Sequence, residues 1–328
     1  MMKKSLIALA IAAAAPAAFA ATSNVDVYGQ ARISISDATK GQGYQVSSET
    51  SRIGMKGSED LGGGLAAVWG LEWGVDLGSS SGTNASANSN SMLSARNQFV
   101  GLKGAFGTVL AGTHDTPYKL GGSADVFGDT RADSQINTSG IIGRNGLDNR
   151  AGNAVAYISP DYAGFHVGVA AVAQETGATT ANAATSAVLV YVNGPLKATL
   201  ANEKFNGAQR GTKLNVAYKM GDISLGYTHE DSKVSPTAAK DKADLMSITY
   251  GMGNITLAAQ YGKFNDADDS ANTIGSVAQA GGDVTRTTAG VVYNLSKRTN
   301  VAVAYNIDDA TDAASDKKTT TVQLNHSF

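Results

Sequence analysis

Residues 116–148 show no strand pattern, and they carry acidic and basic side chains together. The carboxylates are Asp125, Asp129, Asp133 and Asp148, and the cations are Lys119, Arg131 and Arg144. An unpatterned stretch of about thirty residues in a compact domain is usually a functional loop. Opposed charges across a narrow, water-filled gap let a pore sort solutes by size and charge. We therefore predict that this loop folds into a pore and narrows it; the alternative is an exterior loop.

A second set of candidate residues lies on the strands that would form the wall of such a pore. In the run that starts at Val25, apolar side chains fall on one face, while Tyr28 and Arg32 share the polar face. The same alternation turns four basic residues inward: Arg32, Arg52, Lys56 and Arg150. Each alone fits ordinary polar lining. As a group they are the candidates for a basic ladder that faces the loop.

Residues that could carry enzymatic chemistry are scattered along the chain. The histidines stand singly, without a second histidine at metal-ligand spacing or a serine nucleophile motif: His114, His166, His229 and His326. The chain has no cysteine and hence no thiol metal site. Residues 266–269 resemble part of a calcium loop but lack its glycine and terminal glutamate, so at most they hold divalent ions weakly. We expect no catalytic residue, no resident metal and no cofactor.

The candidate residues belong to runs of about ten residues in which apolar side chains occupy every second position. Short turns and long polar loops alternate between these runs. After Ala20, no stretch keeps apolar residues at i, i+3, i+4 and i+7, so no helix is available to cover an apolar sheet face. That face must meet lipid. The pattern is typical of a transmembrane barrel with short periplasmic turns and long extracellular loops.

The predicted fold is all-β, a sixteen-stranded antiparallel transmembrane barrel. Its strands are expected at residues 25–36, 51–58, 64–76, 93–104, 107–115, 149–159, 164–174, 185–193, 195–205, 211–219, 222–231, 242–251, 254–264, 283–294, 299–309 and 318–328. Residues 37–50 are assigned to the first long loop, and residues 116–148 to the third. An even strand number brings the strand ending at Phe328 beside the one starting at Val25, so no edge stays open.

The N-terminus indicates export. Lys3 and Lys4 precede an apolar segment at 6–15 and a small-residue cleavage site at 18–20, so residues 1–20 read as a signal peptide and 21–328 as the barrel domain. Without these two lysines the formal charge changes from −2 to 24 − 28 = −4. A mildly acidic chain gives no basis for nucleic-acid binding. The expected location is the outer membrane.

Several motifs resemble those of one protein family. Residues 51–65 (SRIGMKGSEDLGGGL), 99–109 (FVGLKGAFGTV) and 293–299 (YNLSKRT) are similar to strand–turn–strand signatures of the general porins of beta-proteobacteria and Neisseria. Shorter matches are 25–29 (VDVYG), 157–160 (YISP) and 326–328 (HSF). The resemblance extends from about residue 25 to the C-terminus. It implies a homotrimer of sixteen-stranded barrels, each with its third long loop folded into the lumen as a constriction.

The chain departs from this family at two positions on the wall. Many relatives carry an arginine in the fifth strand, where this chain has residues 111–114 (AGTH), and another in the sixth, where it has 155–157 (VAY). Two wall charges are therefore missing. The anion preference that the resemblance implies is accordingly open, and a weakly selective pore fits as well.

The main functional hypothesis is a general diffusion porin, a passive, water-filled channel for ions and small hydrophilic solutes. The alternative is a substrate-selective nutrient channel, which would line its lumen with aromatic side chains; beyond Tyr28 few of these face inward. An adhesin, a structural barrel or a barrel enzyme forms a third class. Conductance separates the channels from this class, and a saturable, solute-blocked current marks the selective channel.

Three kinds of macromolecular partner are expected. Small outward residues suit contact between barrels in a homotrimer: Gly29, Ala31, Ala67 and Ala111. The outer face would contact membrane lipid, including lipopolysaccharide. The C-terminal Phe328 resembles the assembly signal read by the barrel-assembly machinery.

Overall fold

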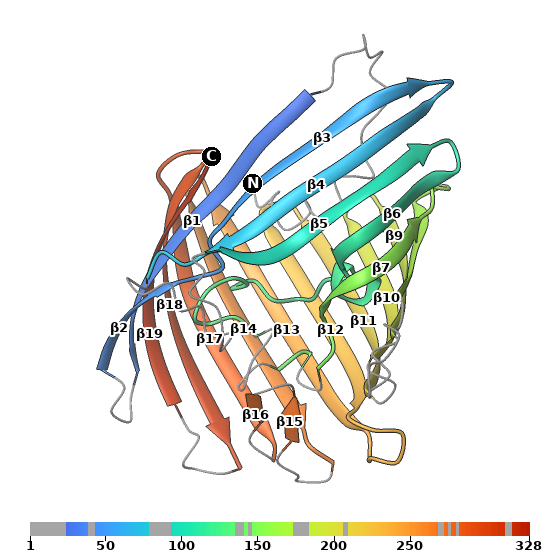
Figure 1. Cartoon of the computed structure of the whole chain (residues 1–328). Coiled ribbons are helices and arrows are strands. Elements are labelled where there is room, and N and C mark those ends of the chain that lie inside the picture. The colour runs from blue at the N-terminus through green and yellow to red at the C-terminus, as the bar shows by residue number, and fades with distance from the viewer. Residues whose placement is uncertain are drawn as a thin grey trace.

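The computed structural model describes residues 24–38, 43–78, 93–134, 141–143, 146–172, 184–205, 209–267, 272–274, 277–279, 282–311 and 317–328. Most of these residues belong to one antiparallel sheet that closes on itself as a barrel (Figure 1). The predicted signal peptide at 1–20 and the loop residue Arg144 lie outside the described residues. In the described part, no helix is long and apolar enough to cross a membrane.

The first half of the wall is formed by β1 (Asn24–Ala38), β2 (Gly43–Ser48), β3 (Arg52–Gly62), β4 (Leu65–Val75), β5 (Leu93–Gly104), β6 (Gly107–Asp115), β7 (Arg150–Ile158), β8 (Phe165–Val172) and β9 (Ala184–Asn193). The second half is formed by β10 (Leu196–Phe205), β11 (Gln209–Met220), β12 (Ile223–Lys233), β13 (Asp241–Met252), β14 (Ile255–Asn265), β17 (Val284–Asn294), β18 (Thr299–Ala310) and β19 (Lys317–Ser327). A separate hairpin joins β15 (Asn272–Ile274) to β16 (Val277–Gln279).

The sheet has 17 strands, but β2 and β3 pair end to end with the single strand β1. β2 and β3 therefore occupy a single strand position in the wall. The barrel has 17 − 1 = 16 strand positions, which confirms the predicted sixteen-stranded barrel. The prediction of a loop at 37–50 is wrong, because β1 continues to Ala38 and pairs with β2 from Gly43. With only Tyr44 and Val46 apolar, this short polar segment carried too weak an alternation to be recognised.

Between β2 and β3 the wall contains a bulge. Two residues of β1 face the three residues 49–51, because the flanking pairs are Ile33↔Ser48 and Gln30↔Arg52. Thr50 in this bulge has φ 49°, which a β-branched residue rarely adopts. Bulges re-aim side chains and are common beside functional sites. Glu49 in this bulge and Arg52 directly after it both belong to the site described below.

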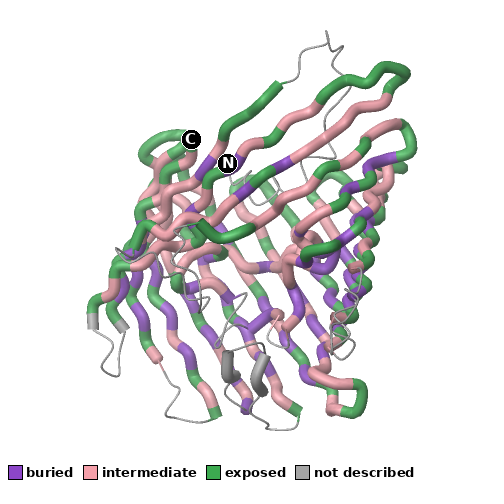
Figure 2. The backbone as a smooth tube through the Cα atoms, viewed as in Figure 1, coloured by how far each residue is buried: buried purple, intermediate pink, exposed green. Residues whose placement is uncertain are grey.

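Burial along the strands is the reverse of that in a water-soluble sheet. Outward apolar side chains are exposed, as at Val27 (61%), while inward polar ones are covered, as at Ser34 and Thr321. Figure 2 shows buried and exposed residues alternating along the strands. An apolar exposed face with a polar interior is the arrangement that lipid outside and water inside require.

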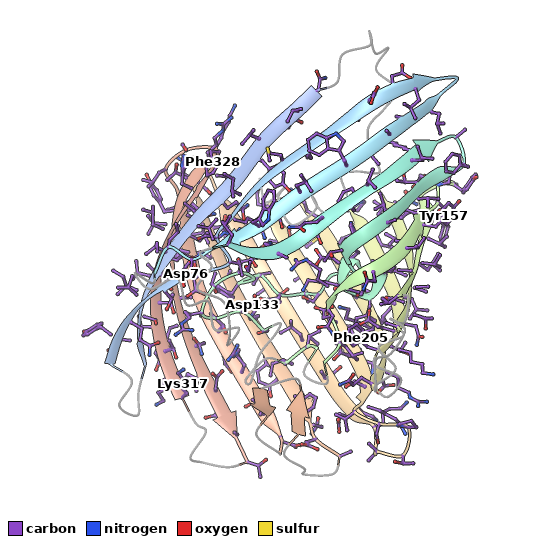
Figure 3. All side chains as sticks on the ribbon, viewed as in Figure 1. Asp76, Asp133, Tyr157, Phe205, Lys317 and Phe328 are labelled. Atoms are coloured by element: carbon purple, nitrogen blue, oxygen red, sulfur yellow. The ribbon has the colours of Figure 1, made fainter. Side chains whose placement is uncertain are left out.

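The barrel closes where the chain ends. β1 pairs with β19 antiparallel, and the backbone N–H groups of Gly29 and Phe328 each donate to the other's carbonyl oxygen at 3.1 Å. The Phe328 ring covers Gly29 so closely that an added Cβ would lie 2.3 Å from it. The C-terminal Phe328, which Figure 3 labels, and the short turn between β3 and β4 lie toward the upper end of the barrel as drawn in Figure 1.

Candidate functional site

The described parts of the segment 116–148, residues 116–134, 141–143 and 146–148, lie in the interior of the barrel (Figure 1). The segment begins with the helix α1 (Pro117–Leu120), whose N-cap Thr116 accepts from the backbone N–H of Lys119 through its side chain. Further on, its backbone amides donate to inward side chains of the far wall. These bonds are Tyr118 N–H to Ser186 Oγ (2.8 Å), Ala124 N–H to Thr228 Oγ1 (2.7 Å) and Val126 N–H to Gln260 Oε1 (3.0 Å). The described parts of the segment are thus bound inside the barrel to β9, β12 and β14.

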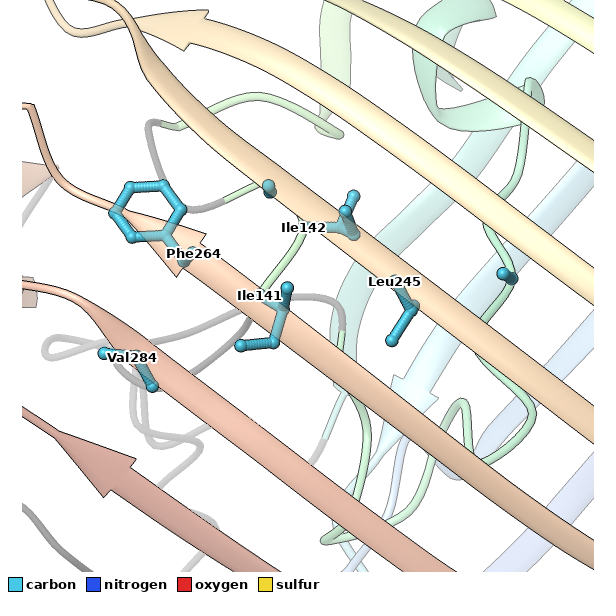
Figure 4. Packing of buried hydrophobic residues seen from close by; sticks show 7 residues of the cluster. Ile141, Ile142, Leu245, Phe264 and Val284 are labelled. Atoms are coloured by element: carbon cyan, nitrogen blue, oxygen red, sulfur yellow. The ribbon is translucent and has the colours of Figure 1, made fainter.

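Three apolar clusters hold the same segment against the wall. Ile141 and Ile142 pack with Leu245, Phe264 and Val284 (Figure 4); Tyr118 and Leu147 pack with Val188, Val190 and Ala201; and Phe127 and Ala132 pack with Ala258 and Ala304. Burial of each large apolar side chain contributes about 1.5–3 kcal/mol. The described parts of the loop are therefore packed against the wall inside the lumen and are not an exterior segment.

Asp129 is the loop carboxylate that meets the predicted basic ladder. Its Oδ2 atom lies 2.5 Å from Nη1 of Arg32 and 3.6 Å from Nη2 of Arg52. Burial by itself would raise the pKa of Asp129, but the two guanidinium groups outweigh burial and hold the pKa below its usual value. Asp129 is therefore ionised at neutral pH, and its charge joins the loop to β1 and β3.

The charges continue from Arg52 along the wall. Its Nε atom lies 4.0 Å from Oε2 of Glu72. Glu72 in turn accepts from Nε of Arg96 at 2.6 Å and from the hydroxyl of Tyr28 at 3.1 Å. We call Arg32, Asp129, Arg52, Glu72 and Arg96 the charged row. It holds three cations and two anions in alternation, which leaves an excess of 3 − 2 = one positive charge.

Arg96 and Glu72 were not among the predicted site residues. Strict alternation from the exposed Val100 and Leu102 would turn Arg96 outward. A second bulge changes this, because Glu72 faces both Arg96 and Asn97 between the register pairs Leu71↔Gln98 and Trp73↔Ala95. The extra residue brings Arg96 onto the face of Glu72. No local sequence signal marks this bulge. The inward direction of Glu72, in contrast, could have been predicted from the alternation with its apolar, outward neighbour Leu71.

The other predicted wall residues have different partners. The ammonium group of Lys56 lies 5.4 Å from the centre of the Tyr28 ring. Arg150 does not pair with a described carboxylate of the loop: its Nη2 atom lies 2.9 Å from Asp115 at the end of β6, and its Nε donates to Asn97 at 2.9 Å. In the loop, Arg131 donates to Gln45 at 2.5 Å and lies 3.7 Å from Glu49.

Asp125 and Asp133 stabilise the loop from within. Asp125 accepts from the backbone N–H groups of Phe127 and Ser134, both at 2.8 Å, and Asp133 accepts from that of Asp129 at 2.8 Å. Burial and the neighbouring Asp125 raise the pKa of Asp133 well above its usual value. These two carboxylates shape the turn that presents Asp129.

Asp148 belongs to a buried polar cluster behind the loop. Its carboxylate pairs with the ammonium group of Lys213 on β11, and neither side chain is exposed. The hydroxyl of Tyr118 donates to Glu230 at 2.7 Å, and the backbone N–H of Gly143 donates to the same carboxylate at 2.9 Å. This cluster fixes the loop and contributes little to the open lumen.

In the described residues, no group of three or more histidine, aspartate or glutamate side chains is placed to hold a metal ion. A closed barrel with an apolar outer face, a polar inner face and a charged loop fixed inside it defines a water-filled membrane channel. The chain belongs to the Gram-negative porin family, whose model matches residues 7–313.

Individual relatives of the chain are also outer-membrane proteins. The chain is 32% identical over 350 residues to outer membrane porin protein 32 of Delftia acidovorans, covering 94% of this chain and 92% of the relative. It is 30% identical over 349 residues to the major outer membrane protein P.IB of Neisseria gonorrhoeae, covering 92% of each. These matches confirm the family resemblance and the outer-membrane location.

Two solved structures share the fold. The anion-selective porin from Comamonas acidovorans superposes with a TM-score of 0.74 at 23% identity, covering 94% of this chain and 100% of that one. The trimer form of OmpT from Vibrio cholerae superposes with a TM-score of 0.71 at 16% identity, covering 94% and 100%.

Proposed function

We propose that the protein is a general diffusion porin in which the charged row is the filter for ions and small hydrophilic solutes. The observation that carries this proposal is the contact of Asp129 with Arg32 and Arg52. The loop is bound to the far wall at β9, β12 and β14, yet its tip reaches β1 and β3. A solute must therefore pass the gap beside this bridge.

The charge at the filter supports a weak preference for anions. The charged row has one positive charge in excess, and the exposed Lys56 lies on the neighbouring Tyr28. The acidic groups of the cluster behind the loop are buried and act less on a passing ion: Asp148, Glu203 and Glu230. The Comamonas acidovorans structure is named anion-selective, and we carry that preference to this chain in weakened form.

Bilayer recordings of the folded, purified protein test this proposal. We expect an unsaturable ion current and, in a salt gradient, a reversal potential on the anion side. Arg96→Gln should reduce the anion-to-cation permeability ratio, because it removes the excess charge. The matched change Lys240→Gln should have little effect, since Lys240 lies in an exterior loop beside Asp231. Equal ratios in both variants would show that the charged row is not the filter.

The same recordings address the alternative of a substrate-selective channel. Such a channel would show current that saturates with one solute and is blocked by it. The described aromatic residues on the inner side lie on different parts of the wall and loop, namely Tyr28, Phe99, Tyr118, Phe127 and Phe264, and the last three are packed between the loop and the wall. They form no continuous track, which favours the unspecific channel.

We also infer that three barrels assemble as a homotrimer. In the single chain Ala111 is exposed and Ala31 and Ala67 are half-buried, whereas Gly29 is covered by Phe328 of the same chain. Gly29, the fourth predicted contact residue, is therefore small because the Phe328 ring packs over it where the barrel closes. A heat-sensitive oligomer whose current closes in three steps is expected, and a folded species that runs and conducts as a monomer would exclude the trimer.

A further inference from the structure

The bulge at residues 49–51 reverses which residues of the wall face the lumen. Before the bulge, β2 turns its odd-numbered residues inward: Val46 is 60% exposed on the outer face, and Gln45 and Glu49 lie on the opposite face. After the bulge, β3 turns the even-numbered Arg52 inward. Strict alternation would send one of these two charged side chains into the membrane. The extra residue therefore places a carboxylate and a guanidinium group on the same inner face.

The side chain of Ser51 holds the bulge in place. This buried hydroxyl accepts from the backbone N–H of Arg32 at 2.9 Å and donates to the carbonyl oxygen of Arg32 at 3.0 Å. The backbone N–H of Glu49 donates to the same carbonyl oxygen at 3.1 Å. The backbone groups of β1 opposite the bulge thus keep partners although the ladder is interrupted. Glu49 consequently has a fixed position on the wall.

The tip of the third loop docks on this bulge. The hydroxyl of Thr50 donates to the carboxylate of Asp129. Two residues further along the loop, the Nε atom of Arg131 lies 3.7 Å from Oε1 of Glu49, and its Nη2 atom donates to Gln45 at 2.5 Å. Both charged side chains of the tip therefore meet a partner on the bulge or on the strand directly before it.

The two members of the pair Glu49–Arg131 differ in exposure. The side chain of Glu49 is 13% exposed and accepts from the hydroxyl of Ser34 at 2.6 Å, so it is fixed from behind. The side chain of Arg131 is 38% exposed inside the lumen. Lys317 of β19, labelled in Figure 3, lies close enough for its charge to repel Arg131. Glu49 therefore holds a cation that its neighbour on β19 repels.

We propose that Glu49 is a specificity-determining residue of the pore, because it holds Arg131 against the wall and so keeps the preference for anions weak. This inference rests on the proposed role of the charged row as the filter. While the ion pair is formed, its two charges nearly cancel for a passing ion, and the single excess positive charge of the charged row decides the preference. Without Glu49, only Gln45 holds Arg131, and its long, permanently charged side chain enters the lumen.

A double-mutant cycle of Glu49→Gln and Arg131→Gln tests this role, with reversal potentials of the folded protein in a salt gradient around about 0.1 M as the readout. Glu49→Gln keeps the shape of the side chain, and its amide oxygen still accepts from Ser34. It should raise the anion-to-cation permeability ratio at least about threefold, the effect of one uncovered charge ~7 Å from a passing ion. In the Arg131→Gln background, the same substitution should change the ratio by less than about twofold, because no cation remains to be released.

Two further variants make the test specific. Arg131→Gln alone should lower the ratio by less than about twofold, because Glu49 already counters that charge. A decrease of about threefold or more would show that Arg131 acts freely in the lumen, and the proposal would be wrong. The matched control is Glu59→Gln, which removes the same charge from an exposed residue beside the short turn between β3 and β4. This control should leave the ratio nearly unchanged.

Unchanged heat-modifiability on gels will show that each variant folds. Equal effects of Glu49→Gln in the two backgrounds would overturn the proposal, because the carboxylate would then act only through its own charge. Equal effects of Glu49→Gln and Glu59→Gln would overturn it as well. Arg96→Gln separates this inference from the proposed function. A shift with Arg96→Gln but none with Glu49→Gln would refute the role of Glu49 and leave the filter standing, whereas no shift with either would refute both.

Discussion

Replacing Asp129 by asparagine removes one negative charge from the charged row with almost no change of shape. The excess charge of the row then rises from one to two positive charges. The amide oxygen of the new side chain would still accept hydrogen bonds from Arg32, so the loop should keep its path. The loop is also held by its apolar clusters and by its bonds to β9, β12 and β14. The expected result is a stronger preference for anions.

The size of this effect follows from Coulomb's law. A univalent ion that passes ~7 Å from the carboxylate in water gains or loses about 0.6 kcal/mol, and screening at 0.1 M salt halves this to about 0.3 kcal/mol. The permeability of the anion and that of the cation each change by about 1.6-fold, in opposite directions, so the ratio of the two permeabilities should change about threefold. At 1 M salt the screening length falls to about 3 Å, and the change should shrink to about 1.2-fold.

Reversal potentials in a tenfold salt gradient measure this ratio. Arg52→Gln should shift the ratio in the opposite direction, because it removes a cation from the same row. The control is Asp222→Asn, the same charge change in an exposed short turn between β11 and β12. If Asp129→Asn and Asp222→Asn give the same ratio at low salt, or if the effect survives 1 M salt undiminished, the charged row does not filter ions as argued.

Four further outcomes are expected. The pKa of Asp129 is depressed in the folded protein, so its ion pair with Arg32 is present above the usual aspartate range and is lost as the pH falls through the depressed pKa. The difference in permeability ratio between the unaltered protein and Asp129→Asn should therefore persist down to about pH 4 and vanish only below that pH. Lys213→Met leaves the Asp148 carboxylate buried and unpaired, which should cost about 3–5 kcal/mol and lower the temperature at which the folded form is lost on heat-modifiability gels; an unchanged temperature would contradict a buried ion pair. Deleting Phe328 removes the two backbone bonds to Gly29 and should sharply reduce folded protein in the outer membrane while export continues, whereas normal levels would refute a role in assembly. Ala111→Arg should convert the trimer to folded monomers in mild detergent, and an intact trimer would place the contact elsewhere.

The barrel could be predicted because its signal is local and repeated. Most strands show the two-residue period, and they carry an outer apolar face that has no other cover. The prediction failed at 37–50, where the short polar strand β2 pairs with the second part of β1, directly before the bulge at 49–51. The register of pairing, which determines where a strand is interrupted by a bulge, depends on the neighbouring strand and cannot be predicted from one segment.

The site was predicted in kind more than in detail. Arg32, Arg52 and Asp129 do come together, since alternation turns the arginines inward and the third loop supplies the carboxylate. Arg96 was missed because an unmarked bulge reverses its parity. Arg150 pairs with Asp115 rather than with the loop. Which loop acid reaches which arginine depends on the route of the loop, and that route is determined by side chains more than a hundred residues away, such as Gln260.

The bonds between Gly29 and Phe328 carry a consequence for how the chain folds. β1 pairs with β19, which is synthesised long after it, so the N–H and C=O groups on this edge of β1 stay unpaired until β19 has been made. In lipid such an open edge is very costly, which forbids insertion strand by strand. Contacts of such high sequence separation also make folding slow. The barrel can therefore close only after β19 has been made, which means that the first strand has to remain unpaired along this edge until a partner far along the chain is available.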